Sequence, residues 1–389
     1  MPTHRAVALR TKLAFALVVL LLVGVALELT VRIAFAAKIG PRVLLYGIVS
    51  DRDEQGVQSH ENVVAGRYSK YFPHQKRRDA DVDTGESFEV TINAHGFRGE
   101  DWSVAKPPGV VRVVTLGASS TFGYHDRDDE TYPHYLERDL AEACPARRFE
   151  VINLGIPHLD AEQILALFVD EALALDPDVV TFYEGINDAQ GGGWRAPTAP
   201  SLASRVRRAV REHLLLAALL ADLRAKKSFT ADEVAAHVGG KAERFLASLA
   251  QIREQSRERG IELAVVTQQA QSGMKTREEM RGLRYGEEVA RIRERLASQG
   301  EIASGELYLL AHDELMRALR GWSAANGVTL VDGIAALDAR RDTMVSWVHL
   351  NAEGNRILSR AIASALLPRV CPGAPPPAAG VDSAAAPSR

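Results

Sequence analysis

A turn of small residues near the middle of the chain carries two adjacent serines. Residues 111–116, which precede the turn, are almost all apolar and β-branched, as is typical of a strand buried on both faces of a parallel sheet. Gly117 ends this run, and Ser119 and Ser120 follow it before a segment of helical pattern. Open α/β sheets place their chemistry at such a turn, at the carboxyl end of a strand. A hydroxyl held there suits nucleophilic catalysis, although a serine in this position can equally cap the helix.

Three later segments place further polar groups at or beyond strand ends. A second apolar strand runs up to Gly155, a third is followed by Asn187 and Asp188, and His349 lies just before a C-terminal helix. Acyl transfer needs a nucleophile, a base within hydrogen-bond reach and donors directed at the developing oxyanion. A hydroxyl, an imidazole, a glycine N–H and a side-chain amide are groups of these kinds.

In this order, the segments resemble the four blocks of the SGNH (GDSL-like) hydrolase family, over roughly residues 110–368. Gly117-Ala118-Ser119 stands where the family has Gly-Asp-Ser, and Gly155, Gly185-x-Asn187-Asp188 and His349 match the other blocks. The segment Asn93-Ala94-His95-Gly96-Phe97-Arg98-Gly99 adds a similarity to bacterial members with an N-terminal membrane segment.

The resemblance implies a role for each matched residue. Ser119 would be the nucleophile and His349 the general base, and the oxyanion hole would consist of the N–H groups of Ser119 and Gly155 and the Asn187 amide. A glycine would let substrate approach the backbone closely at position 155. Ser120 is the adjacent rival and a candidate helix cap. The candidates for lining the pocket are Ser120, His125, His158 and Asp188.

One departure from the family concerns the group that orients the base. The family has Asp three residues before the His, where this chain has Ser346. Such an acid holds the Nδ1–H of the imidazole and stabilises the imidazolium that forms during attack. Either Ser346 or a backbone carbonyl orients His349, or Asp342 reaches it from seven residues away, or activity is reduced or absent.

The N-terminus predicts a membrane segment. Basic residues at positions 4–12 precede an unbroken apolar run, Leu13–Leu27, and Glu28 and Arg32 follow inside a stretch that stays otherwise apolar. A cleaved signal peptide also begins this way. We favour an uncleaved anchor over residues 1–37, because a cleavage site directly behind two charges is unusual. The basic start then stays in the cytoplasm, and the rest is periplasmic or extracellular.

Beyond the anchor we expect a small β-rich region at 38–109, a hydrolase domain at 110–370 and a disordered tail at 371–389. The domain alternates strands with helices, which predicts a doubly wound, flavodoxin-like sheet of five parallel strands in the order 2-1-3-4-5. The strands are expected at 111–116, 149–154, 178–184, 261–267 and 328–332. The helices are expected at 131–143, 161–175, 241–258, 305–325 and 353–367. Two helical insertions are expected near 190–230 and 272–300, the first with a basic helix at 203–224 that is either a lid or a surface for a membrane or an acidic glycan.

The two cysteines form a candidate disulfide. Cys144 ends the helix after the first strand and Cys371 follows the last helix. In a 2-1-3-4-5 sheet these two helices pack on the same face, with both ends away from the site, and an exported location permits oxidation.

Composition narrows the class of ligand. The formal net charge is −3, which gives no argument for nucleic-acid binding, and no Cys-x-x-Cys, His-x-x-x-His or phosphate-loop motif indicates a metal, a nucleotide or another cofactor. The sequence therefore predicts a serine esterase outside the cytoplasmic membrane, acting on O-acyl groups, such as acetyl, of a carbohydrate or lipid. The alternatives are an O-acyltransferase on a cell-envelope glycan and a non-catalytic glycan-binding or scaffold protein with a degenerate site.

Overall fold

The computed structural model describes most of the chain, in two units. The described residues are 9–39, 61–82, 84–193, 195, 202–203, 214–216, 228–273 and 275–373. One unit comprises Met1–Val57 and Pro197–Lys226, and the other comprises Gln58–Ala196 and Lys227–Arg389. Most of the expected tail and most of the expected basic helix at 203–224 lie outside the described residues.

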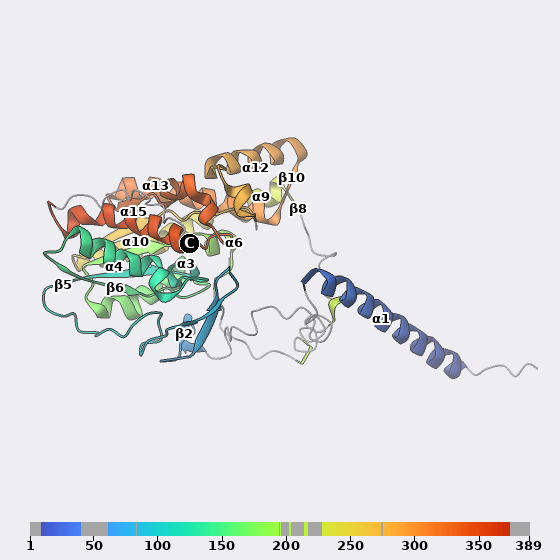
Figure 1. Ribbon diagram of the computed structural model, residues 1–389. Helices are drawn as coiled ribbons and strands as arrows, with labels where there is room; N and C mark the ends of the chain where they lie inside the picture. The colour runs from blue at the N-terminus through green and yellow to red at the C-terminus, as the bar shows by residue number, and fades with distance from the viewer. Residues whose placement is uncertain are drawn as a thin grey trace, which may run out of the picture. The chain divides into compact units, whose positions relative to one another are not determined.

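A parallel sheet of five strands forms the centre of the second unit (Figure 1). Its strands are β5 (Val110–Gly117), β6 (Arg148–Asn153), β7 (Val179–Tyr183), β9 (Glu262–Val266) and β11 (Thr329–Val331). Their order across the sheet is β11-β9-β7-β5-β6, and every neighbouring pair is parallel. This confirms the predicted class and strand order. All residues of β5 are buried, in keeping with its apolar, β-branched sequence.

Helices cover both faces of the sheet. Val111 and Val113 of β5 pack in one apolar cluster with α4 (Tyr132–Ala143) and α15 (Ala352–Val370). Val114 and Leu116 belong to the other cluster, which contains α5 (Ala161–Leu167), α10 (Lys241–Glu258) and α13 (Ser304–Asn326). The segment expected as one helix over 161–175 continues beyond α5 as a π-helix, η2 (Phe168–Ala172), and a 3₁₀ turn, η3 (Leu173–Leu175).

The remaining elements of the core are short. The second insertion contains α11 (Arg277–Met280) and α12 (Tyr285–Gln299) and is helical as predicted. An antiparallel pair that the sequence did not predict, β8 (Ser228–Thr230) with β10 (Glu301–Ala303), joins the ends of the two insertions, next to α9 (Ala231–Val238). The other short helices are α3 (Ser119–Phe122), η1 (Asp128–Glu130), α6 (Ile186–Gln190), α14 (Gly333–Leu337) and η4 (Asp338–Thr343).

The region before the core is a small β-rich attachment. Two antiparallel hairpins form it, β1 (Glu61–Val64) with β2 (Tyr68–Tyr71) and β3 (Arg77–Ala80) with β4 (Ser87–Val90). Tyr68 and Phe97 enter the main core, and Phe122 of α3 packs among Tyr71, Phe88, Val90 and Ile92. The attachment therefore shares apolar packing with the turn that carries Ser119.

A long apolar helix and a disulfide complete the described structure. α1 (Leu9–Ile39) contains a stretch, Thr11–Ala34, with a mean hydropathy of 2.6, which is long and apolar enough for a membrane anchor or a signal sequence. Glu28 and Arg32, four residues apart on this helix, form an ion pair of 2.8 Å. In the other unit, Cys144 at the end of α4 is joined to Cys371 at the end of α15, with Cα atoms 6.2 Å apart.

Candidate active site

The register of three adjacent strands brings the predicted site segments to one edge of the sheet. Gly117 of β5 pairs with Tyr183 of β7, and the Ile156 N–H donates to the Gly117 carbonyl at 3.2 Å. The residues that follow β5, β6 and β7 therefore emerge at the same carboxyl edge. Ser119, Gly155 and Asn187 are among them.

The turns after β5 and β6 are close-packed, which explains Gly117 and Gly155. A Cβ on Gly117 would lie 2.5 Å from the Tyr183 carbonyl oxygen, and one on Gly155 would lie 2.2 Å from the Phe122 nitrogen. Neither backbone position can accept a side chain without moving. At position 155 the glycine thus lets the end of β6 pack on α3. The expectation that it also lets substrate approach the backbone stays a prediction.

Arg98 holds the loop that follows α3. Its side chain is buried, donates to the carbonyls of Phe122 and Gly123 and to the Asp126 carbonyl, and forms a 2.9 Å ion pair with Asp128. These bonds satisfy carbonyls at the end of a short helix, which have no partner inside it. Arg98 is part of the Asn93–Gly99 motif, so this motif connects the attachment to the loop that follows α3.

Ser119, His349 and Ser346 form a hydrogen-bonded chain, in which Ser119 and His349 make up a dyad. The Ser119 Oγ lies 2.8 Å from His349 Nε2, and the Ser346 Oγ lies 2.7 Å from His349 Nδ1. If Nε2 accepts the Ser119 proton, Nδ1 carries the ring hydrogen and donates it to Ser346. The backbone N–H of His349 donates to the same Ser346 oxygen at 3.2 Å. One hydroxyl therefore fixes both the ring and the backbone of His349.

A tight loop gives His349 its position. Met344 and Leu350 form an antiparallel bridge, and the Val345 N–H donates to the His349 carbonyl at 2.9 Å. Asn351 then caps α15, because its side chain accepts the Gly354 N–H. The loop is closed over so few residues that the side chain three positions before His349 faces the imidazole.

Burial keeps the imidazole neutral. It lowers the pKa of His349 to about 3; His125 and His158 act in the same direction, and Asp79 opposes them. A histidine with this pKa is unprotonated at neutral pH, as a general base must be. It is also a weak base, because the pKa lies far below the pH of the surrounding solution.

The oxyanion candidates are already partly engaged. The Asn187 amide nitrogen donates one hydrogen to the Leu159 carbonyl at 2.8 Å and carries a second. The Gly155 N–H donates to Asn153 Oδ1 at 2.8 Å, within its own turn, so in this conformation it is already engaged, and its role as an oxyanion donor stays a prediction. The Ser119 N–H stands at the first position of α3, where an amide has no acceptor inside the helix.

Ser120 is not the helix cap that the sequence suggested. Ala118 occupies the N-cap position of α3, and the buried Ser120 hydroxyl accepts a hydrogen bond from Gln268 Nε2 at 3.2 Å. Gln268 Oε1 in turn accepts the Ile186 N–H at 2.9 Å and so connects the turns after β5, β7 and β9. Nothing in the local sequence distinguished Gln268 from its polar neighbours.

Two carboxylates singled out in the sequence are engaged elsewhere. Asp342 binds Arg340 at 3.1 Å, and both ring nitrogens of His349 already have partners, so the prediction that Asp342 orients His349 is wrong. Asp188 accepts the Ala161 N–H at 3.0 Å at the start of α5, so it stabilises that helix instead of facing the dyad as a pocket residue. Burial and the neighbouring Asp160 raise the pKa of Asp188 to about 7.

Two histidines flank the dyad. His125 and His158 both adopt left-handed backbone conformations, with φ of 70° and 69°. The His125 ring centroid is 5.7 Å from that of His349, and His158 is exposed. His125 therefore borders the dyad directly.

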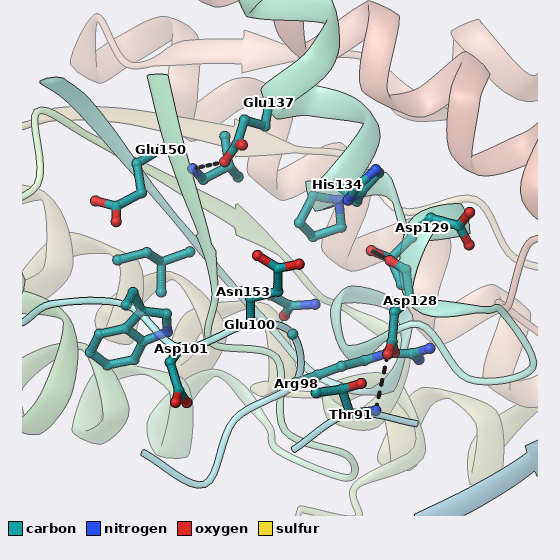
Figure 2. Close-up of a pocket in the computed structure, with 16 residues that line it drawn as sticks. Thr91, Arg98, Glu100, Asp101, Asp128, Asp129, His134, Glu137, Glu150 and Asn153 are labelled. Carbon is teal, nitrogen blue, oxygen red and sulfur yellow. Dashed lines mark hydrogen bonds and ion pairs between the residues drawn. The ribbon is translucent and has the colours of Figure 1, made fainter. Parts of the chain in front are cut away.

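A cavity of about 430 Å³ lies apart from these residues, between the attachment, η1, α4 and β6 (Figure 2). Figure 2 shows carboxylates around it and Arg98 beside Asp128 at its rim. Its acidic lining comprises Glu100, Asp101, Asp128, Asp129, Glu137 and Glu150. None of Ser119, Ser346 and His349 lines it, so this cavity is separate from their hydrogen-bonded chain. Over the described residues, no group of His, Cys, Asp and Glu side chains is arranged to hold a metal ion.

The comparison with family models identifies the fold family. The model of the GDSL-like lipase/acylhydrolase family matches residues 115–357.

The chain belongs to the GDSL-like lipase/acylhydrolase family.

Membership supports an esterase or acylhydrolase. Among solved structures, the chain is similar to a GDSL-like lipase from Bacteroides thetaiotaomicron, with 13% identity, 66% of this chain and 87% of that chain covered, and a TM-score of 0.38. It is also similar to an acetyl xylan esterase, with 15% identity, 66% of this chain and 100% of that chain covered, and a TM-score of 0.39. A mutant acetylxylan esterase from Geobacillus stearothermophilus is similar at 15% identity, with 66% of this chain and 94% of that chain covered and a TM-score of 0.39. No curated protein matches the sequence.

Proposed function

We propose that this family member is a serine esterase whose nucleophile and base are Ser119 and His349. The observation that carries the proposal is the 2.8 Å contact between Ser119 Oγ and His349 Nε2. At this distance the imidazole can take the hydroxyl proton as the oxygen attacks an ester carbonyl. The protonated Nε2 then returns the proton to the leaving alcohol, and water repeats the cycle on the acyl-enzyme.

The charge that develops on the carbonyl oxygen needs donors at the same edge. The Ser119 N–H and the second hydrogen of the Asn187 amide are the candidates that retain capacity in this structure. The Gly155 N–H joins them once substrate draws it from Asn153 Oδ1, which is in the same turn. A donor that is released only when substrate binds can form its bond to the oxyanion in the transition state and not before. Such an interaction accelerates the reaction, because it stabilises the transition state more than the bound substrate.

Ser346 orients the imidazole of His349 in place of the acid that the family has at this position. Its hydroxyl holds Nδ1–H at 2.7 Å and so fixes the tautomer that leaves Nε2 unprotonated. A neutral hydroxyl adds no charge to stabilise the imidazolium. We therefore expect an active enzyme with a modest turnover number.

The site acts outside the cytoplasmic membrane in this proposal. The apolar helix α1 serves as an uncleaved anchor, and a disulfide between Cys144 and Cys371 suits an oxidising compartment. Its substrate is then an acyl ester carried by a component of the cell envelope.

A fluorophosphonate probe tests the proposal, because such probes label activated serines. The full chain in detergent should be labelled and should hydrolyse short-chain aryl esters, and Ser119→Ala should lose both activities. Ser69→Ala, at a hydroxyl of β2 outside the dyad, is the control. A folded wild-type protein that neither reacts with the probe nor hydrolyses the esters would refute the esterase.

A further inference from the structure

The hairpin β3–β4 directs two charged side chains toward the loop after α3. Along β3, alternate residues Arg77 and Asp79 are buried, with 4% and 3% of their surfaces exposed, while Arg78 faces solvent. Burying a charge is costly unless it is paired or hydrogen-bonded. Two charges in one short strand therefore need partners: Arg77 donates to the Tyr71 hydroxyl at 2.9 Å, and Asp79 contacts His125.

Asp79 binds His125 in two ways. Its Oδ2 accepts the His125 backbone N–H at 3.0 Å, and its Oδ1 lies 3.4 Å from His125 Nδ1. Although burial acts to raise it, the pKa of the Asp79 carboxyl lies below its ordinary value because of these His125 contacts. The carboxylate is thus ionised at neutral pH, and it helps to hold His125 in its left-handed conformation, φ 70°.

His125 contacts both Asp79 and His349. Its ring meets that of His349 edge-on, with centroids 5.7 Å apart and planes at 72°. Tyr124 meets the same imidazole edge-on at 5.5 Å, and the Arg77 guanidinium lies behind it, 5.2 Å from the Tyr124 ring. The groups facing His349 are thus Ser119, Ser346, Tyr124, His125 and, more distantly, His158, with Arg77 and Asp79 behind them.

The electrostatic consequence concerns the imidazolium. During attack the Ser119 O–H bond breaks, its oxygen bonds to the carbonyl carbon, and the proton moves to His349 Nε2. The resulting positive charge is disfavoured by the neighbouring His125 and His158 and favoured by Asp79. In this low-dielectric setting a buried carboxylate acts across one intervening ring more strongly than it would through water.

We propose that Asp79 is a positioning residue of this site, and that through His125 it supplies the negative charge that the family places three residues before the histidine. No proton moves onto Asp79; it stays a carboxylate throughout and holds the His125 ring against His349. The inference rests on the proposed function. It also makes the β-rich attachment a part of the reaction site.

Asp79→Asn tests the inference, because it removes the charge and leaves an oxygen to accept the His125 N–H. We expect kcat on an aryl ester to fall about tenfold with KM unchanged, as expected for one charge at an effective dielectric constant of about 20. Removing a negative charge destabilises the protonated imidazole, so the acid limb of kcat/KM should move to lower pH.

The matched control is Asp170→Asn. Asp170 also joins the attachment to the core, through a 2.6 Å ion pair with Arg67, but it does not border His349. This variant breaks a contact between the attachment and the core and should keep the wild-type pH profile. The inference would be overturned if Asp79→Asn and the wild type had the same pH profile, or if Asp79→Asn and Asp170→Asn lost the same amount of kcat. Either result would leave the proposed esterase function unaffected.

A second variant covers the case in which Asp79→Asn does not fold. His125→Asn suits a left-handed backbone position and keeps the N–H that Asp79 accepts. The ring that Asp79 holds against His349 is then gone, so kcat should also fall several-fold, although a neighbour that opposes the imidazolium is lost with it. An unchanged kcat would overturn the inference. A wild-type protein without Ser119-dependent reactivity would refute the proposed function itself, and the inference with it.

Discussion

Replacing Ser346 with Asp would restore the family's acid at the position that already faces the imidazole. The Ser346 Oγ is 2.7 Å from Nδ1 and also accepts the His349 backbone N–H at 3.2 Å. A carboxylate can accept both bonds, and the half-buried position leaves its remaining oxygen access to water. The substitution changes the charge of the acceptor and keeps the hydrogen-bond pattern.

The expected gain follows from the difference between the two acceptors. A hydrogen bond to a charged group contributes roughly 1.5–3 kcal/mol, and a neutral one roughly 0.5–1.5 kcal/mol. The carboxylate stabilises the imidazolium more than the neutral imidazole, so the difference between the midpoints, about 1.2 kcal/mol, applies to the transition state. We therefore expect Ser346→Asp to raise kcat on an activated aryl ester about tenfold.

The pH profile provides an independent readout. A carboxylate beside Nδ1 favours the protonated ring, so the pKa of His349 should rise from about 3 and the acid limb of kcat/KM should move to higher pH. The control is Ser346→Asn, which is similar in size but neutral and should give no gain. The reasoning fails if Ser346→Asp melts like the wild type yet changes neither kcat nor the acid limb, or if the gain persists in His349→Ala.

Three further predictions concern the nucleophile, the disulfide and the membrane. Ser119→Ala should lower kcat by about a million-fold, as for other serine nucleophiles, whereas Ser120→Ala should keep most activity because Ser120 binds Gln268; a dead Ser120→Ala would mean that the wrong serine was assigned. Breaking the Cys144–Cys371 bond, whose two residues are 227 positions apart, should destabilise the fold by up to about 5 kcal/mol in the chain-entropy treatment. The double variant Cys144→Ser/Cys371→Ser should therefore have a lower Tm, and Ser119 should still be labelled by the fluorophosphonate probe. Alkaline phosphatase fused after residue 60 should be active if α1 is an anchor with its basic start inside, and a mature protein that begins near Ala37 would instead reveal a cleaved signal.

The sequence by itself determined the sheet and the edge at which the site lies. Runs such as Val111–Leu116 can be strands only if both faces are covered, and their alternation with helices requires parallel order. Because parallel strands end at one edge, the residues after β5, β6 and β7 had to converge whatever the packing details. The pairing of Cys144 with Cys371 follows from the same topology, because the two helices that they end share one face.

Only the tertiary structure decided which polar atoms meet. Ser346 and Asp342 were both open as partners of His349, and the narrow loop closed by the Met344–Leu350 bridge brings Ser346 to the ring while Asp342 binds Arg340. Asp79 is far from His349 in the chain. The sequence does not show that it is buried, because a charged residue in a short strand is usually expected to face solvent. Hydrogen bonds and charges select partners by distance and direction in space, and periodicity along the chain records only which side of an element is buried.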